Sequence, residues 1–148
     1  MSIVERSVHL SENRDRVFAF VSDPDNFAAY VAGYAAGRVT SERSTGVGSA
    51  FEWTSRIGPI SLRAREEVSE WQAPGVVAYT GRIAGVGFRS RMGLSERSDG
   101  GTDLCVTVDY RLPPKRGGQL GDAFVRRLVE RDMKRSLHVL EARFGLAY

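Results

Sequence analysis

The sequence predicts an α+β fold in which a curved antiparallel sheet packs against one long C-terminal helix. Between residues 38 and 112, apolar and polar residues alternate with period two, which is the period of a β-strand. Short turns rich in glycine or proline separate these segments, so consecutive strands are expected to pair as hairpins. The last apolar pattern repeats about every 3.6 residues and predicts a helix over 120–144. This helix is the only expected element long enough to cover the apolar face of the sheet.

Size and composition indicate one folded domain over residues 1–148. Hydrophobic residues make up 42% of the chain and charged residues 26%, which excludes a disordered chain. No apolar run approaches the ~18 residues of a membrane span, and the N-terminus lacks an apolar signal core, so we expect a cytoplasmic protein without integral membrane contact. The single cysteine, Cys105, excludes an internal disulfide, and with only two histidines we expect no metal and no cofactor.

Two short helices are expected near the N-terminus. The first strand is predicted over 3–10, and Ser11 precedes a short helix with an apolar stripe. The proline-containing segment 23–26 ends this helix and opens a second helical turn, which carries Phe27 and Tyr30.

Six further strands follow. Their expected ranges are 38–43, 50–57, 60–71, 76–83, 88–95 and 103–112. Gly58-Pro59 and Asp99-Gly100-Gly101 are turn signals within this region. Pro113-Pro114 is expected to end the sheet, and Gly117-Gly118 to lead flexibly into the last helix.

The last helix has two polar residues on its apolar side. At about 100° per residue, one broad arc collects Val125, Leu128, Val129, Met133, Leu137, Val139, Leu140 and Phe144. Asp132 and Ser136 fall near the middle of this arc, although an unpaired buried carboxylate is expensive. Either Asp132 pairs with a sheet arginine or reaches water through helix tilt, or this arc lines a cavity in which polar groups orient a ligand.

Glu66 is a similar exception in the strand expected over 60–71. It alternates with Ala64 and Val68 and therefore falls on the apolar face. A bulge or a strand end could turn it outward. Otherwise it faces the same cavity as Asp132.

These exceptions lead to a candidate ligand site between sheet and helix. Its expected apolar wall consists of Trp53, Leu62, Phe88, Met92, Tyr110, Val129, Met133 and Leu140. Its expected polar anchors are Glu66, Tyr110, Asp132 and Ser136. Because aromatic and aliphatic residues also fill ordinary cores, periodicity alone does not distinguish a lined cavity from a packed core.

Motifs for other chemistries are missing. Gly46-Val47-Gly48 and Gly85-Val86-Gly87 lack the third glycine and the following helix of a dinucleotide site, so both are interpreted as hairpin glycines. No Walker motif, nucleophile elbow or zinc-protease pair is present. The net charge of +3 includes many arginines, but acids are interleaved among them, so we expect no nucleic-acid partner.

Three segments carry a resemblance to a known family. Residues 17–27 (VFAFVSDPDNF), 47–53 (VGSAFEW) and 67–74 (EVSEWQAP) are similar to motifs of START-like proteins, also called the SRPBCC superfamily, which includes polyketide cyclases and dehydrases and lipid-transfer domains. Residues 109–114 (DYRLPP) and 135–137 (RSL) also match a common bacterial ending. The resemblance implies a helix-grip fold, in which a seven-stranded antiparallel sheet wraps around the C-terminal helix and leaves an apolar cavity. It implies no catalytic residue, because the matching motifs belong to the scaffold.

Three functions remain open at this point. The first is binding or transport of a hydrophobic small molecule such as a lipid, a polyketide or a quinone-like compound. The second is a cyclase or dehydratase that uses Asp132 or Glu66 as a general base and Tyr110 as a hydrogen-bond donor. The third is a ligand-free interaction or chaperone-like module. In each case the chain is expected to be a monomer or a homodimer.

Overall fold

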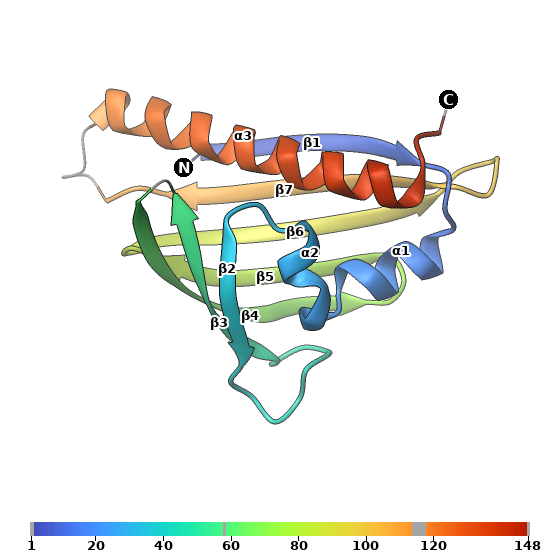
Figure 1. Ribbon diagram of the computed structural model, residues 1–148, viewed down its shortest axis with the longest axis horizontal. Helices are drawn as coiled ribbons and strands as arrows, with labels where there is room; N and C mark the ends of the chain where they lie inside the picture. Colours follow the sequence, from blue (N-terminus) through green and yellow to red (C-terminus); the bar gives the residue numbers. More distant parts are fainter. Residues whose placement is uncertain (1, 58, 114–117, 148) are drawn as a thin grey trace.

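The computed structural model describes residues 2–57, 59–113 and 118–147 (Figure 1). In chain order the elements are β1 (Ser2–Leu10), α1 (Arg14–Val21), the 3-10 turn Pro24–Asn26, α2 (Phe27–Tyr30), β2 (Tyr34–Val39), β3 (Ala50–Ile57), β4 (Ile60–Gln72), β5 (Val76–Ile83), β6 (Val86–Glu96), β7 (Thr102–Arg111) and α3 (Gly118–Phe144). None of these helices is long and apolar enough to span a membrane.

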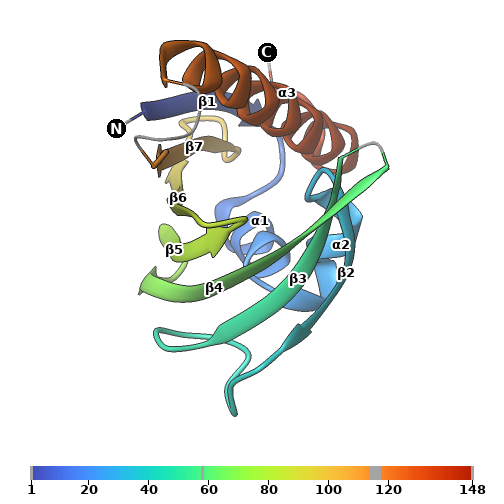
Figure 2. The ribbon, with the colours of Figure 1, turned by 90° about the vertical axis from the view of Figure 1, so that its left-hand side faces the viewer.

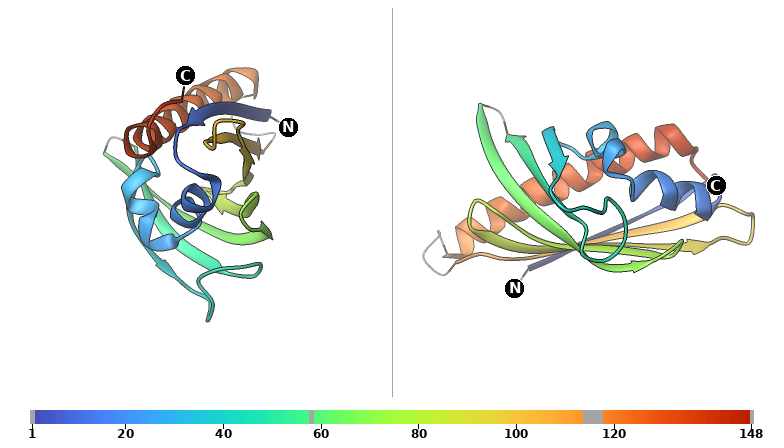
Figure 3. Two further views of the ribbon diagram at one scale, coloured as in Figure 1. Left: turned by 90° about the vertical axis from the view of Figure 1, so that its right-hand side faces the viewer. Right: turned by 90° about the horizontal axis from the view of Figure 1, so that it is seen from below.

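The seven strands form one antiparallel sheet with the order β1-β7-β6-β5-β4-β3-β2. From β2 to β7 each strand pairs with the next one in the chain, as hairpin connections require. The first strand closes the order by pairing with β7, with Val4 opposite Val108. The sheet is strongly curved, and all three helices lie on its concave side (Figures 2 and 3). This confirms the α+β helix-grip fold.

The helices cover the concave side unevenly. The long helix α3 runs along β1 and packs against α2 (Figure 1). Near α1 and the C-terminal end of α3, the core is filled by side chains with almost no exposure, among them Leu10, Val17, Val21, Leu104 and Leu140. The hydrophobic core is therefore most closely packed at this end of the concave side.

Two local expectations about the N-terminal half are wrong in detail. The first helix is capped by Asn13 rather than Ser11, because the Asn13 side chain accepts a hydrogen bond from the Arg16 backbone N–H. The second strand covers Tyr34–Val39 rather than 38–43. Beyond it the chain leaves the sheet, and the Ser41 hydroxyl accepts the Ala50 N–H at 2.9 Å to hold the loop.

Val139 was expected in the apolar arc of α3, but this residue is 41% exposed and does not belong to it. It lies about 120° around the helix from Met133, which is buried, so it faces away from the core. The expected turn at Gly58 and the expected features at Pro114 and Gly117 fall outside the described residues.

Candidate functional site

A single row of residues crosses the concave face of the sheet in register. Its members, each paired with the next across neighbouring strands, are Phe51, Glu66, Gly81, Phe88 and Tyr110. Residues directly opposite each other in a sheet point to the same face. The row therefore places one carboxyl group among aromatic rings in the middle of the concave face.

The structure keeps Glu66 on this face. The irregularity in the pairing of β4 with β5 lies between Val68 and Glu70, beyond Glu66, so no bulge turns this side chain outward. Burial raises the pKa of Glu66 to about 7, and the nearby Trp53 indole N–H opposes part of this shift. Near neutral pH the carboxyl group is thus present in both its protonated and its ionised forms.

Gly81 makes room for Glu66. A Cβ atom at this position would lie 2.8 Å from the Glu66 Cβ, 2.9 Å from the Phe88 ring and 2.3 Å from the Arg65 carbonyl oxygen. Only glycine leaves this space without displacing its neighbours. The Glu66 side chain and the Phe88 ring therefore both begin on the concave face beside Gly81.

Two polar groups beside this row lack hydrogen-bond partners. The Tyr79 hydroxyl and the Trp53 indole nitrogen are buried and find no partner of normal geometry among the described residues. Tyr79 pairs with Val68 and Trp53 with Ala64, so these side chains flank Glu66 on the same face. Burial and the charge of Glu66 raise the pKa of Tyr79. Unpaired buried donors are rare in folded proteins.

Aromatic side chains frame these polar groups. Tyr34 stacks on Trp53 with ring centroids 5.4 Å apart, and Phe27 contacts Phe51 and Tyr79 edge to face at 5.5 and 6.1 Å. The Tyr30 hydroxyl is already used, because it donates to the Val21 carbonyl at 2.6 Å. The polar groups beside Glu66 are therefore surrounded mostly by aromatic rings.

Away from α1, several side chains of the concave face retain accessible surface. Among the inward-facing apolar side chains that remain half-buried rather than buried are Leu62, Ile83, Val86, Phe88, Met92 and Val108 from the sheet and Val125 and Val129 from α3. In a close-packed core such residues would have almost no accessible surface. Their partial exposure supports an apolar space between the sheet and the N-terminal half of α3.

The two polar exceptions on α3 have local partners. The Asp132 carboxylate lies 3.5 Å from the Arg131 guanidinium and is 30% exposed, so its partner is on its own helix rather than on the sheet. The Ser136 hydroxyl accepts the backbone N–H of Ala32 at 2.9 Å and ties α3 to the segment after α2. Neither contact reaches Glu66.

The other predicted residues divide between core and open face. Met133 and Leu140 are buried in the core, whereas Leu62, Met92 and Val129 are half-buried. Tyr110 ends the row at β7, where its hydroxyl donates to the Asp122 carbonyl of α3 at 3.4 Å. The row of Glu66 thus leads across the sheet to the first turns of α3.

Sequence reasoning missed Tyr34 and Tyr79. Tyr79 lies in a segment whose alternation was visible, whereas Tyr34 precedes the strand expected over 38–43. The position of both beside Glu66 depends on strand register, which alternation within one strand does not give. The only available signal was that each is an aromatic residue with a polar end on an inward position.

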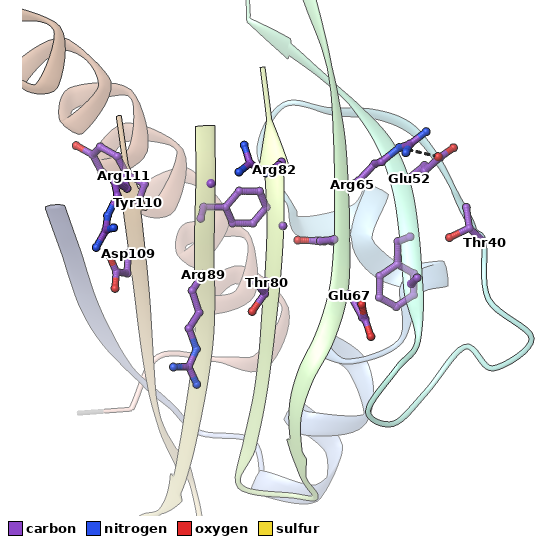
Figure 4. A pocket seen from close by; sticks show the side chains of 16 residues that line it. Thr40, Glu52, Arg65, Glu67, Thr80, Arg82, Arg89, Asp109, Tyr110 and Arg111 are labelled. Carbon is purple, nitrogen blue, oxygen red and sulfur yellow. Dashed lines mark ion pairs between the residues drawn. The ribbon is translucent and has the colours of Figure 1, made fainter. Parts of the chain in front are cut away.

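A pocket of about 670 Å³ lies on the other side of the same row. On each of the strands β3–β7, its lining consists of the row residue and its two chain neighbours, and none of the described side chains of α3 lines it. These neighbours, such as Arg65 and Glu67, point away from the concave face. The pocket is a trough on the outer face, with the helices behind the sheet in Figure 4.

Comparison with known proteins identifies the family of the chain and finds solved structures with the same fold. The family model described as "Polyketide cyclase / dehydrase and lipid transport" matches residues 1–145. The chain belongs to this family. The match confirms the START-like, or SRPBCC, resemblance carried by the sequence motifs.

Several solved structures share the fold at low identity. A protein from Thermus thermophilus is 18% identical with a TM-score of 0.81, and the match covers 97% of both chains. A START superfamily protein from Mycobacterium smegmatis is 14% identical with a TM-score of 0.79 over 96% of both chains. The ZhuI aromatase/cyclase from a Streptomyces species is 16% identical with a TM-score of 0.72 over 93% of this chain and 87% of its own. No curated protein matches the sequence.

Proposed function

We propose that the protein binds a hydrophobic small molecule between the concave face of the sheet and the N-terminal half of α3. The observation that carries this proposal is the buried carboxyl group of Glu66, flanked by the Trp53 N–H and the unpaired Tyr79 hydroxyl, at the edge of a half-buried apolar face. Family membership is consistent with such a ligand.

The two parts of the site have different roles. Burying apolar ligand surface contributes roughly 25 cal/mol per Å², so the aromatic and aliphatic wall provides affinity. The carboxyl, indole and hydroxyl groups orient a ligand that carries an oxygen or nitrogen at one end. We therefore expect a guest with one polar end, such as a lipid, a polyketide or a quinone-like compound.

The neutral probe N-phenyl-1-naphthylamine tests this site. We expect its fluorescence to rise on binding with a micromolar or lower Kd. Val129→Trp should weaken binding at least tenfold, because Val129 is half-buried over the concave face. Val139→Trp is the matched control on the exposed side of the same helix and should bind normally. Failure of the folded wild-type protein to bind the probe would contradict the proposal.

One observation favours a second function, proton transfer to a bound guest. A carboxyl group with a pKa near 7 can both accept and donate a proton at neutral pH. Native mass spectrometry of the protein purified from its own host would identify the guest. Conversion of that guest by the wild type but not by Glu66→Gln, with binding retained, would establish the enzyme; equal conversion by both would exclude Glu66 as the base.

A further inference from the structure

The outer face of the sheet is strongly cationic at the end formed by the β3–β4 and β5–β6 turns. The outward-facing charged residues of this end are Arg38, Glu52, Arg56, Arg63, Arg65, Arg82 and Arg111. Glu52 is the single acid among them, and Arg38 and Arg65 already hold its carboxylate at 3.1 and 3.0 Å. The hydrogen bond from Arg38 and the charges of the neighbouring arginines lower the pKa of Glu52.

Four of these arginines, Arg56, Arg63, Arg82 and Arg111, have no carboxylate partner among the described residues, and of these four Arg82 and Arg111 line the trough. The ion pairs among the described residues include neither Arg82 nor Arg111. Arg82 donates at 3.3 Å to the Gly85 carbonyl, which holds its side chain over the β5–β6 turn. Both arginines line the outer trough of about 670 Å³ (Figure 4).

Gly87 leaves an opening between them. Gly87 pairs with Arg82 on one side and with Arg111 on the other, so the two arginines flank a residue without a side chain. A Cβ atom at Gly87 would meet nothing within 4 Å. Because neighbouring strands lie about 4.8 Å apart, the two arginines start roughly 10 Å apart on one face. Their long side chains can then converge on one group above Gly87.

We propose that this trough is a second binding site, which takes a compact phosphate-bearing group between Arg82 and Arg111. Guanidinium groups bind phosphate through paired, charge-assisted hydrogen bonds. The site is separate from the concave face, because Arg82, Gly87 and Arg111 lie on the opposite side of the sheet from Glu66.

The opposite wall of the trough limits the size of the anion. One row away, the outward residues Glu67, Thr80, Arg89 and Asp109 include two acids, and the Arg89 guanidinium is 3.6 Å from Glu70. A long polyanion lying across both rows would meet these carboxylates. The charge pattern thus favours a single phosphate or diphosphate group over a nucleic acid.

Calorimetric titration with inorganic pyrophosphate at low salt tests the proposal. We expect saturable binding that the double variant Arg82→Gln/Arg111→Gln weakens at least tenfold. Gly87→Val should weaken it similarly, since a side chain would then fill the opening while both arginines remain. Arg127→Gln removes an exposed arginine of α3 and is the matched control, which should bind like the wild type.

Each result of the titration and of a vesicle experiment either supports or overturns the phosphate site. No saturable binding by the wild type, or equal loss in the Arg127 control, would overturn the proposal. Co-sedimentation with phosphatidylcholine vesicles containing phosphatidic acid, lost in both trough variants, would identify a lipid headgroup as the source of the phosphate. Pyrophosphate binding without vesicle binding would identify a soluble phosphate ester; either result supports the site. Unchanged unfolding midpoints would show that the variants are folded.

Discussion

The Glu66 carboxyl group links the stability of the fold to pH. Its pKa is raised from 4.5 to about 7 in the folded protein, so the folded state holds this proton more tightly than the unfolded chain does. The stabilisation from this proton is complete below about pH 4.5 and is lost as the pH rises through 7. Over that range it amounts to about 3 kcal/mol.

Glu66→Gln should remove this dependence. Urea unfolding at pH 5 and pH 8 should show the wild type losing roughly 2 kcal/mol more than the variant between these pH values, since glutamine does not ionise. Glu67→Gln, the next residue on the exposed face, is the control and should follow the wild type. Parallel pH profiles for Glu66→Gln and the wild type would show that Glu66 is not a buried acid.

For single residues, the sequence predicted which polar side chains interrupt the apolar faces. It did not predict the partners of all of these side chains. Glu66 was identified from alternation alone, and its inward position follows from the unbroken pairing of β4 up to Val68. Asp132 and Ser136 were identified in the same way, yet their partners are Arg131 and the Ala32 backbone. A helical projection gives the direction of a side chain but not the loop or neighbour that it meets.

Gly81 of β5 and Gly87 of β6 differ in the space that each leaves for a side chain. A Cβ atom at Gly81 would collide with Glu66, Phe88 and the Arg65 backbone, whereas one at Gly87 would enter open space. We expect Gly81→Ala to destabilise the protein by roughly 1–3 kcal/mol through overpacking. Gly87→Ala should be neutral or slightly stabilising, because glycine is unfavourable within a strand.

Chemical denaturation of the two variants measures this difference. Equal stabilities for both would mean that the space above Gly81 is not occupied by the Glu66 and Phe88 side chains. This outcome would also remove the geometric basis for the site at Glu66.

The helix α3 is tied to the segment after α2 by one hydrogen bond. Ser136→Ala removes the acceptor of the Ala32 N–H and should cost about 1 kcal/mol. Amide hydrogen exchange at Ala32 should become faster. Ser7→Ala, on the exposed side of β1, is the control and should leave that exchange rate unchanged. Unaltered protection of Ala32 in Ser136→Ala would show that this bond does not hold the segment.

The order and type of the elements were predictable, because the periodic segments are long and glycine or proline residues mark the turns between them. The strands Ala50–Ile57 and Val76–Ile83 were placed at their observed ends. The strand Tyr34–Val39 was placed four residues too late. Its first residue, Tyr34, stacks on Trp53 of the neighbouring strand, and alternation within the segment does not reveal this contact. Strand register, and with it the row containing Glu66, required the structure.

Across the whole molecule, the concave side is closely packed at one end and loosely packed at the other. Leu10, Leu104 and Leu140 are fully buried near α1, while Val86, Phe88 and Val129 retain accessible surface. The first end provides the stability of the fold. The second is where we place the guest.

The two faces of the sheet also differ in chemical character. The same strands present apolar and aromatic residues inward and a cationic trough outward, so one sheet separates two chemically different surfaces. Alternation in the sequence predicts both faces, but the opening at Gly87 between two arginines becomes visible only in the paired strands.

Crystal diffraction under xenon pressure tests the central claim most directly, because xenon enters apolar cavities without a polar partner. We predict xenon density between Val129 of α3 and the Val86 and Phe88 side chains. The claim would be contradicted by a crystal structure in which protein side chains fill this space and no xenon binds there.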